Sequence, residues 1–331
     1  MARLCRVLVL GAGGFVGSHL VRRLRSEGAW VRGADLKRPD FSASAADDFV
    51  IADLRDPDCV RRCLRGGFDE VYQLAADMGG AGYLFTGRHD FDIFRNSASI
   101  NLNVASACSA SRVGRLFFSS SACVYNQDYQ RSAADAYACR ESDVYPANPD
   151  SEYGWEKLFS ERLFGAVARQ TGMAVRIGRL HNVYGPEGTW RGGREKAPAA
   201  ICRKVAEAAD GGTITLWGDG RQLRSFLDID DCIEGIVSLM RSDVDEPMNI
   251  GSDEVVSIGA LAAMVIGFSG KRVGIGYEPG PLGVGARSSD NTMIRKKLGW
   301  APSIPLRTGI ERTYAWIEAQ VQATTESCQV V

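Results

Sequence analysis

The sequence has almost no net charge. Its 331 residues include 39 Lys and Arg against 40 Asp and Glu, which gives a formal net charge of −1. Proteins that bind nucleic acid or an anionic membrane surface through electrostatics usually carry a clear positive excess. We therefore expect no nucleic acid partner, and we expect any anionic ligand to be held by a few local groups.

Long apolar runs and paired cysteines are also missing. No apolar stretch approaches the roughly 20 residues of a membrane span. Residues 7–16 are apolar and follow Arg3 and Arg6, but they contain glycines and lack the end of a cleavable signal, so a strand and turn are expected there. Nine cysteines are scattered without a CxxC pair, and Cys59 and Cys63 have no nearby histidine for a metal site. The sequence thus predicts a cytoplasmic protein with reduced thiols, no membrane contact and no metal.

Strand and helix patterns alternate along the first half of the chain. Apolar runs typical of buried parallel strands occur at 6–10, 30–34, 49–51, 70–74, 116–119 and 174–177, and helix-length segments occur at 18–26, 93–111 and 153–169. This order predicts βαβ units and an α/β fold with a Rossmann-type doubly wound parallel sheet.

The pattern changes after residue 186, where loops rich in Gly and Arg begin. Helices are expected at 197–208, 229–240 and 306–321, followed by a frayed polar tail from residue 324. We predict a Rossmann domain at 1–178, to which 226–257 returns. The remaining segments, 179–225 and 258–331, are expected to form a smaller, interleaved C-terminal substrate lobe.

A glycine turn stands between the first strand and the first helix. Gly11, Gly14 and Gly17 form a GxxGxxG pattern, which lets backbone approach a pyrophosphate at a helix N-terminus. Asp35 ends the second strand and suits the hydroxyls of an adenosine ribose. Its carboxylate would repel a 2′-phosphate and so favours NAD, although the basic pair at 37–38 weakens that choice. The alternative is a glycine turn in a structural protein.

A strand that ends in serines precedes a tyrosine and a lysine by about thirty residues. Tyr153 and Lys157 are i and i+4, so they share one helix face. An ammonium beside a phenol lowers the phenol pKa from its usual value of about 10. Tyr153 can then take a hydroxyl proton while hydride leaves the same carbon, with Ser121 hydrogen-bonded to that hydroxyl. By itself this spacing also fits an ordinary surface pair.

The glycine turn followed by Ser121, Tyr153 and Lys157 resembles the extended short-chain dehydrogenase/reductase family, in which a hydroxyl usually stands where Cys123 stands. A ketone at C4 of a sugar makes the hydrogens on C3 and C5 acidic, and inversion needs a base on one face and an acid on the other. Cys123 is the candidate base, because a thiol pKa of about 8.5 falls near cations. Lys196, in a basic loop, is the candidate acid. A buried small hydrophobic residue and a solvated cation are the ordinary alternatives.

Several segments are similar to the GDP-mannose 3,5-epimerase family over about residues 5–320. They are residues 76–80, 121–123, 179–186, 192–200 and 217–220. The resemblance implies an NAD-dependent isomerase with a GDP-sugar substrate, and a homodimer formed through a helix pair that includes 93–111.

The resemblance also implies roles for individual residues. Cys123 and Lys196 match the acid/base pair, and Tyr153 and Lys157 match the redox pair. The implied cofactor contacts are Gly11, Gly14, Phe15, Val16, Gly17, Asp35, Asp53, Leu54, Ala75, Tyr153 and Lys157. The implied substrate contacts are Gly79, Asn182, Glu195, Lys196, Lys204, Gln222, Arg224 and Arg287.

Other functions of the same scaffold stay open. A nucleotide-sugar 4-epimerase needs no carbon acid/base, and a 4,6-dehydratase normally has an Asp-Glu pair where residues 122–123 stand. A non-catalytic NAD-sensing protein would not need Ser, Tyr and Lys. Residues 80–92, 126–140 and 285–286 depart from the family pattern, so C3, C5 or both can be the inverted centre. Inversion of C5 alone gives GDP-L-gulose, and inversion of both gives GDP-L-galactose.

Overall fold

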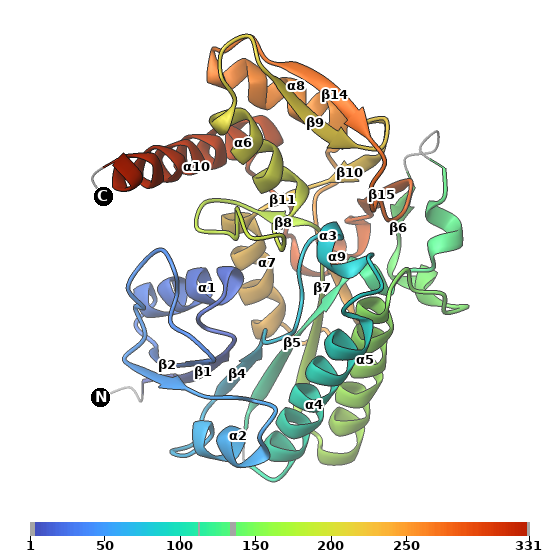
Figure 1. Ribbon diagram of the computed structural model, residues 1–331. Coiled ribbons are helices and arrows are strands. Elements are labelled where there is room, and N and C mark those ends of the chain that lie inside the picture. Colours follow the sequence, from blue (N-terminus) through green and yellow to red (C-terminus); the bar gives the residue numbers. More distant parts are fainter. Residues whose placement is uncertain (1–3, 112, 133–136, 330–331) are drawn as a thin grey trace.

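A parallel sheet of seven strands forms the centre of the larger domain in this computed structural model, which describes residues 4–111, 113–132 and 137–329 (Figure 1). The strand order is β12-β7-β5-β4-β1-β2-β3. The strands are β1 (Arg6–Leu10), β2 (Trp30–Asp35), β3 (Asp48–Ile51), β4 (Glu70–Gln73), β5 (Arg115–Ser121), β7 (Ala174–Leu180) and β12 (Met248–Ile250). All of them pair in parallel, so the predicted α/β Rossmann-type sheet is confirmed.

Helices cover both faces of this sheet because its strands are apolar on both sides. Val7 and Val9 pack in one core with α1 (Phe15–Ser26) and α7 (Ile229–Arg241). Leu8 and Leu10 alternate to the other core, which includes side chains of the helices α2 (Pro57–Cys63), α4 (Asp90–Ser109) and α5 (Glu152–Thr171). The sheet therefore lies between two helix layers, with the carboxyl ends of its strands turned toward the second lobe (Figure 1).

The second lobe is built around small sheets and a third core. Its strands are β6 (Ala138–Cys139), β8 (Val183–Tyr184), β9 (Thr213–Trp217), β10 (Leu223–Ser225), β11 (Leu227–Asp228), β13 (Val255–Ser257), β14 (Gly274–Glu278) and β15 (Ala286–Ser289). The order β13-β10-β15-β6 forms the largest of these sheets. Apolar side chains of α6 (Ala197–Glu207), α8 (Ile258–Ser269) and α10 (Leu306–Gln329) form the core of the lobe. Short helices complete the chain: α3 (Ala81–Leu84), α9 (Thr292–Leu298) and the 3-10 turns Ala122–Val124, Gln127–Gln130 and Glu141–Val144.

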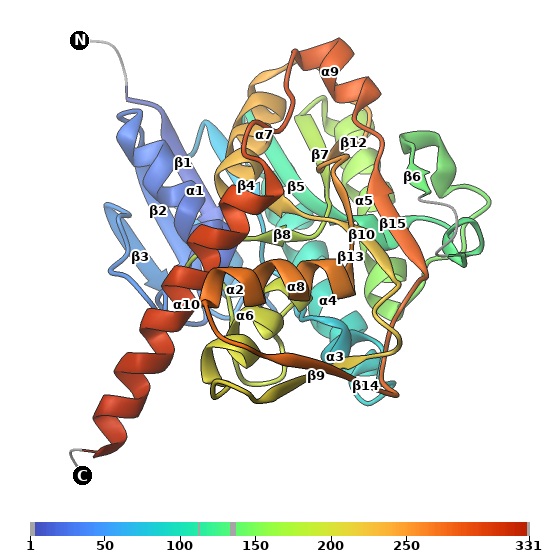
Figure 2. The same cartoon turned by 90° about the horizontal axis from the view of Figure 1, so that it is seen from above.

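The last helix is longer than the sequence predicts. A frayed tail was expected from residue 324, but α10 continues to Gln329 and extends away from the rest of the molecule (Figure 2). The tail contains no Gly or Pro to stop a helix, and the hydroxyls of Thr324 and Thr325 donate to the carbonyls of Gln320 and Val321 one turn earlier. Residues 330–331 lie outside the described part.

Two central strands also extend further than their apolar runs. β5 reaches Ser121 and β7 reaches Leu180, paired residue by residue. The extension is polar, and it stays buried because Glu161 accepts hydrogen bonds from Ser120 at 2.5 Å and from Arg179 at 2.8 Å. These longer strands carry the serines to the edge where the cavity lies. Within the described residues, no helix combines the length and the apolar character needed to cross a membrane.

Candidate active site

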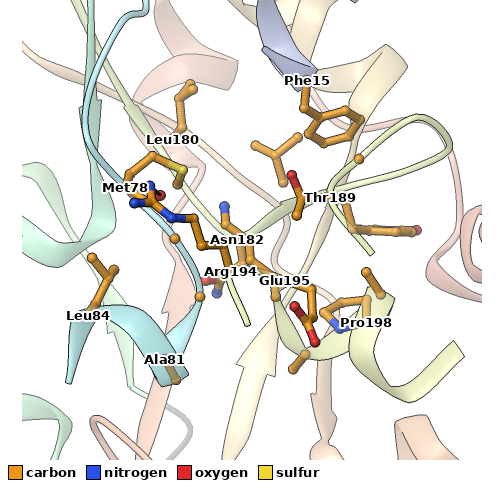
Figure 3. Close-up of a pocket in the computed structure, with 18 of the residues that line it drawn as sticks. Phe15, Met78, Ala81, Leu84, Leu180, Asn182, Thr189, Arg194, Glu195 and Pro198 are labelled. Carbon is orange, nitrogen blue, oxygen red and sulfur yellow. Dashed lines mark hydrogen bonds between the residues drawn. The ribbon is translucent and has the colours of Figure 1, made fainter. Parts of the chain in front are cut away.

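A cavity of about 820 Å³ lies between the carboxyl ends of the central strands and the second lobe. Its walls include the glycine turn after β1, the ends of β4, β5 and β7, the start of α6, and residues of β10 and β15. Figure 3 shows part of this wall, with Phe15 on one side and Leu84 on the other. Open α/β sheets bind their ligands at such an edge. The cavity is therefore the candidate active site.

The glycine turn packs so closely against backbone that side chains are excluded at two of its positions. A Cβ atom on Gly11 would stand 2.8 Å from the backbone nitrogen of Ala75, and one on Gly17 would stand 2.0 Å from the carbonyl oxygen of Gly11. Gly11 also has a φ of +90°, which favours glycine. Gly14 precedes α1 without a side-chain cap, so the first N–H groups of the helix remain available. The turn thus fits a dinucleotide pyrophosphate.

Asp35 lines the cavity beside this turn. It accepts hydrogen bonds from the backbone N–H groups of Gly13 at 2.9 Å and of Lys37 at 3.3 Å. Burial raises the pKa of its carboxyl above the usual value, and these hydrogen bonds oppose the shift. Asp53 and Leu54 lie outside the cavity wall: Asp53 pairs with Arg55 at 2.7 Å, and Leu54 is buried. Their expected cofactor contacts stay predictions.

Tyr153 and Lys157 enter the cavity from the first turns of α5. Ser151 caps the helix by accepting a hydrogen bond from Gly154 N at 3.3 Å. Lys157 Nζ donates to the carbonyl of Ser119 at 2.9 Å and lies 5.6 Å from the centre of the Tyr153 ring. Ser121, Tyr153 and Lys157 all line this cavity.

The pKa of Tyr153 shifts in the direction opposite to the expected one. The pKa of Tyr153 is raised, not lowered, because burial disfavours the phenolate and the charges of Cys123 and Glu156 add to that effect, while a hydrogen bond with Ser121 opposes it. Burial also lowers the pKa of Lys157. Helix spacing indicates the nearby ammonium, but desolvation of the buried phenol is the largest influence on its pKa.

Cys123 lies in the 3-10 turn that follows β5. The Ser121 hydroxyl accepts a hydrogen bond from Cys123 N at 3.2 Å. The turn packs closely on α5, because a Cβ on Gly154 would stand 2.2 Å from the carbonyl oxygen of Cys123. The expected fall of the Cys123 thiol pKa near cations is wrong: burial and then Asp150 raise this pKa, while Arg287 and Ser121 oppose the shift without reversing it.

Lys196 faces the same cavity at the N-cap of α6. Burial lowers the pKa of its ammonium, and the charge of Cys123 is the first influence that opposes the shift. The thiol and the ammonium are therefore close enough to interact electrostatically. A lysine with a lowered pKa gives up its proton more readily near neutral pH.

A clamp that the sequence reasoning missed holds the loop before Lys196. Arg194 donates to Asp77 at 3.0 Å and to the Tyr83 hydroxyl at 2.8 Å, and its guanidinium lies over the Tyr83 ring. Gly80 N donates to the Arg194 carbonyl at 2.9 Å. Figure 3 shows Arg194 reaching across to Met78. The only sequence signal for this clamp is the basic loop that follows Gly192 and Gly193, and that signal does not indicate Asp77 as the acidic partner.

The other predicted substrate residues all line the cavity. Most of them already form hydrogen bonds within the protein. Asn182 donates to the Ser225 carbonyl and Lys204 donates to the Thr215 carbonyl. Glu195 accepts from Gly193 N and Arg203, and Arg224 donates to the carbonyls of Leu282, Val284 and Gly285. Gly79 packs under Tyr83. Gln222 differs, since its buried Oε1 has no hydrogen-bond donor among the described residues. A ligand hydroxyl or N–H group is what this acceptor lacks.

The chain is similar to known proteins over most of its length. Residues 7–251 match the model of the NAD dependent epimerase/dehydratase family. The chain is 44% identical to GDP-mannose 3,5-epimerase 1 of Oryza sativa subsp. japonica, over 96% of this chain and 82% of that protein. It is also 44% identical to GDP-mannose 3,5-epimerase of Arabidopsis thaliana, over 96% and 83%. The solved structure of UDP-glucuronic acid 4-epimerase from Bacillus cereus, in complex with UDP-glucuronic acid and NAD, gives a TM-score of 0.80 at 25% identity and covers 95% of this chain and 99% of that one.

Proposed function

The chain belongs to the NAD dependent epimerase/dehydratase family, and from this premise we propose that it is an NAD-dependent isomerase that inverts GDP-mannose at C5, at C3 or at both. One observation carries the proposal: a thiol and an ammonium, Cys123 and Lys196, line the same cavity as Ser121, Tyr153 and Lys157. The 44% identity to curated GDP-mannose 3,5-epimerases supports the substrate.

The residues present fit NAD. Gly11 and Gly17 allow the turn to pack tightly, and Gly14 places no side chain before the N-terminus of α1, whose N–H groups can bind a pyrophosphate. Asp35 lines the same cavity and can accept a hydrogen bond from a ribose hydroxyl. NAD held by these residues would supply reversible acceptance of the C4 hydride, so no net oxidant would be consumed. Asp35 is also the group that disfavours a 2′-phosphate at this position.

Tyr153 exchanges the proton of the C4 hydroxyl. Ser121 orients that hydroxyl, and the bond from Lys157 to the Ser119 carbonyl fixes the ammonium beneath the phenol ring. Because burial raises the pKa of Tyr153, the phenol holds its proton tightly unless positive charge is brought beside it. Positive charge beside the ring favours the phenolate, which takes the C4 hydroxyl proton at the start of the cycle, and the phenol returns that proton to the C4 oxygen at its end.

Cys123 and Lys196 perform the inversion. With C4 as a ketone, the thiolate of Cys123 takes the hydrogen of C5 or C3 as a proton: the C–H bond breaks, an S–H bond forms, and the electron pair moves to the C4 oxygen. Lys196 then delivers a proton to the opposite face of the same carbon. The lowered pKa of Lys196 supports its role as the donor.

The direct test is NMR spectroscopy of the products formed from GDP-mannose in heavy water, without added reductant or oxidant. We expect solvent deuterium on C5, on C3 or on both, together with GDP-L-gulose or GDP-L-galactose. A product inverted at C4 without carbon-bound deuterium would assign the chain to the 4-epimerases instead. Exchange confined to hydroxyl groups would rule the mechanism out.

We also infer that the protein is a homodimer in the cytoplasm. Large apolar side chains are exposed along neighbouring helices, Phe91 and Leu102 on α4, Trp155 and Phe159 on α5. Their spacings of 11 and 4 residues place each pair on one helix face, and such a patch is typical of an interface. The thiols of Cys59, Cys63, Cys108, Cys123, Cys139, Cys202 and Cys232 form no disulfide, which suits a reducing compartment.

Replacement of both Leu102 and Phe159 by aspartate is expected to convert the dimer to a monomer, because unpaired negative charges are costly to bury in an apolar interface. Sedimentation velocity measures the change. Aspartate at Leu282, an exposed apolar residue of the second lobe, serves as the control and should leave the dimer intact. A wild-type protein that sediments as a monomer would contradict the inference.

A further inference from the structure

The guanidinium of Arg287 is committed to protein partners on three sides. Its Nη1 donates to Cys123 Sγ at 3.4 Å, its Nη2 to Asp150 Oδ2 at 2.7 Å and its Nε to Gln130 Oε1 at 2.5 Å. The ion pair with Asp150 is buried, with side chains 6% and 3% exposed. This arrangement differs from that of an arginine held free for an incoming phosphate.

Three separate segments build this cluster. β15 supplies Arg287, the loop before α5 supplies Asp150, and the 3-10 turn Gln127–Gln130 supplies Gln130. Gln130 is fully buried and donates its own amide to the carbonyl of Asn126 at 3.0 Å. It belongs to the stretch 126–140 that departs from the family pattern, so the divergent segment reaches the centre of the site through this side chain.

We propose that Arg287 is a positioning residue for the Cys123 thiolate, held by Asp150 and Gln130, and not a ligand of the substrate diphosphate. The inference rests on the proposed function, since it assigns a role toward the base of that reaction. The guanidinium stabilises negative charge on sulfur, and the fixed Nη1 hydrogen bond sets the direction of the sulfur lone pairs.

Asp150 limits how strongly Arg287 acts. When Cys123 has taken the proton from carbon and is a neutral thiol, the carboxylate of Asp150 alone balances the positive charge of Arg287. No unpaired charge then remains buried beside the thiol. The other charged or titratable groups that interact with Cys123 are Tyr153, Lys196 and Arg224. Arg287 lowers the pKa of the thiol and Asp150 raises it, so the two members of one ion pair have opposite effects on the same sulfur.

The opposite effects of Arg287 and Asp150 on the thiol pKa provide a test of the proposal. The rate at which iodoacetamide alkylates Cys123 is measured against pH by mass spectrometry of the Cys123 peptide, in the wild type, Arg287→Gln and Asp150→Asn. We expect the midpoint to rise by about one pH unit in Arg287→Gln and to fall by about one unit in Asp150→Asn. The asparagine keeps an oxygen for the Nη2 hydrogen bond, and Cys123→Ala identifies the peptide signal.

A role in folding alone would give a different result. Loss of packing would move both midpoints in the same direction or leave them unchanged, and either outcome overturns the proposal. Should Arg287→Gln fail to fold, Asp150→Asn and Arg287→Lys carry the test, with a midpoint in Arg287→Lys near that of the wild type. In steady-state kinetics, Arg287→Gln should lower kcat about tenfold with KM for GDP-mannose little changed, whereas loss of a diphosphate ligand would raise KM. Alkylation needs no substrate, so failure of the epimerase proposal appears only in the product spectrum.

Discussion

Replacement of Cys123 by alanine is expected to reduce deuterium incorporation at sugar carbon by about 10³-fold, because it removes the group that takes the proton. Lys157 is held by the Ser119 carbonyl, and the Ser121 hydroxyl accepts its hydrogen bond from the backbone N–H of residue 123, which alanine retains, so both should keep their positions. The variant should therefore still bind NAD, and it should still transfer hydride at C4. NMR of GDP-mannose recovered from heavy water measures the deuterium incorporation, and the amount of NAD released on denaturation measures the cofactor binding.

The matched control is Cys202→Ala. Cys202 is buried in the core of the second lobe, and its loss leaves a small cavity without touching the active site. This control should lose stability while it retains exchange. Exchange that persists in Cys123→Ala would transfer the role of base to another residue and contradict the mechanism proposed above.

The sequence predicts the cofactor side of the site well because local rules govern it. A glycine turn between a buried strand and a helix has few possible conformations, and Gly11 and Gly17 face backbone atoms that exclude any side chain. Tyr153 and Lys157 follow from helix spacing. In each of these cases the residues that determine the geometry lie within about one strand, turn and helix of one another.

The partners of the thiol could not be predicted in this way. Asp150, Gln130 and Arg287 come from segments 20 to 157 residues apart, and none of them stands in a pattern that marks a pair. The family resemblance implies only that Arg287 contacts the substrate. Its actual neighbours depend on the pairing of β15 with β6 and β10, which is a tertiary property.

The same reason explains why the pKa of Tyr153 is raised, although the sequence predicts a lowered pKa. Helix spacing places an ammonium near the phenol, but burial is set by the whole cavity wall, and burial is the larger influence on the pKa. The apolar pattern does not predict the last residues of β5 and β7 for a related reason. Arg179 and Ser120 are tolerated inside because Glu161, on a helix that packs against the sheet, satisfies both.

Replacement of Lys196 by methionine is expected to separate the two halves of the inversion. The base remains, so Cys123 can still remove a proton and return deuterium to the same face. GDP-mannose recovered from heavy water should then carry deuterium at the exchanging carbon with its configuration unchanged. Inverted products should fall by about 10²-fold to 10³-fold, because the opposite face has lost its proton donor.

Arg191→Met is the control, since Arg191 lies exposed in the same loop, outside the cavity wall. The exchange rate of Lys196→Met should itself fall by a smaller factor than inversion, because the ammonium and the thiol interact and loss of the cation disfavours the thiolate. Equal losses of exchange and inversion, with NAD retained, would mean that both proton transfers use one group. Retained exchange with lost inversion means that the sulfur and the ammonium act on opposite faces of the ring, so that neither group alone inverts the carbon centre next to the ketone.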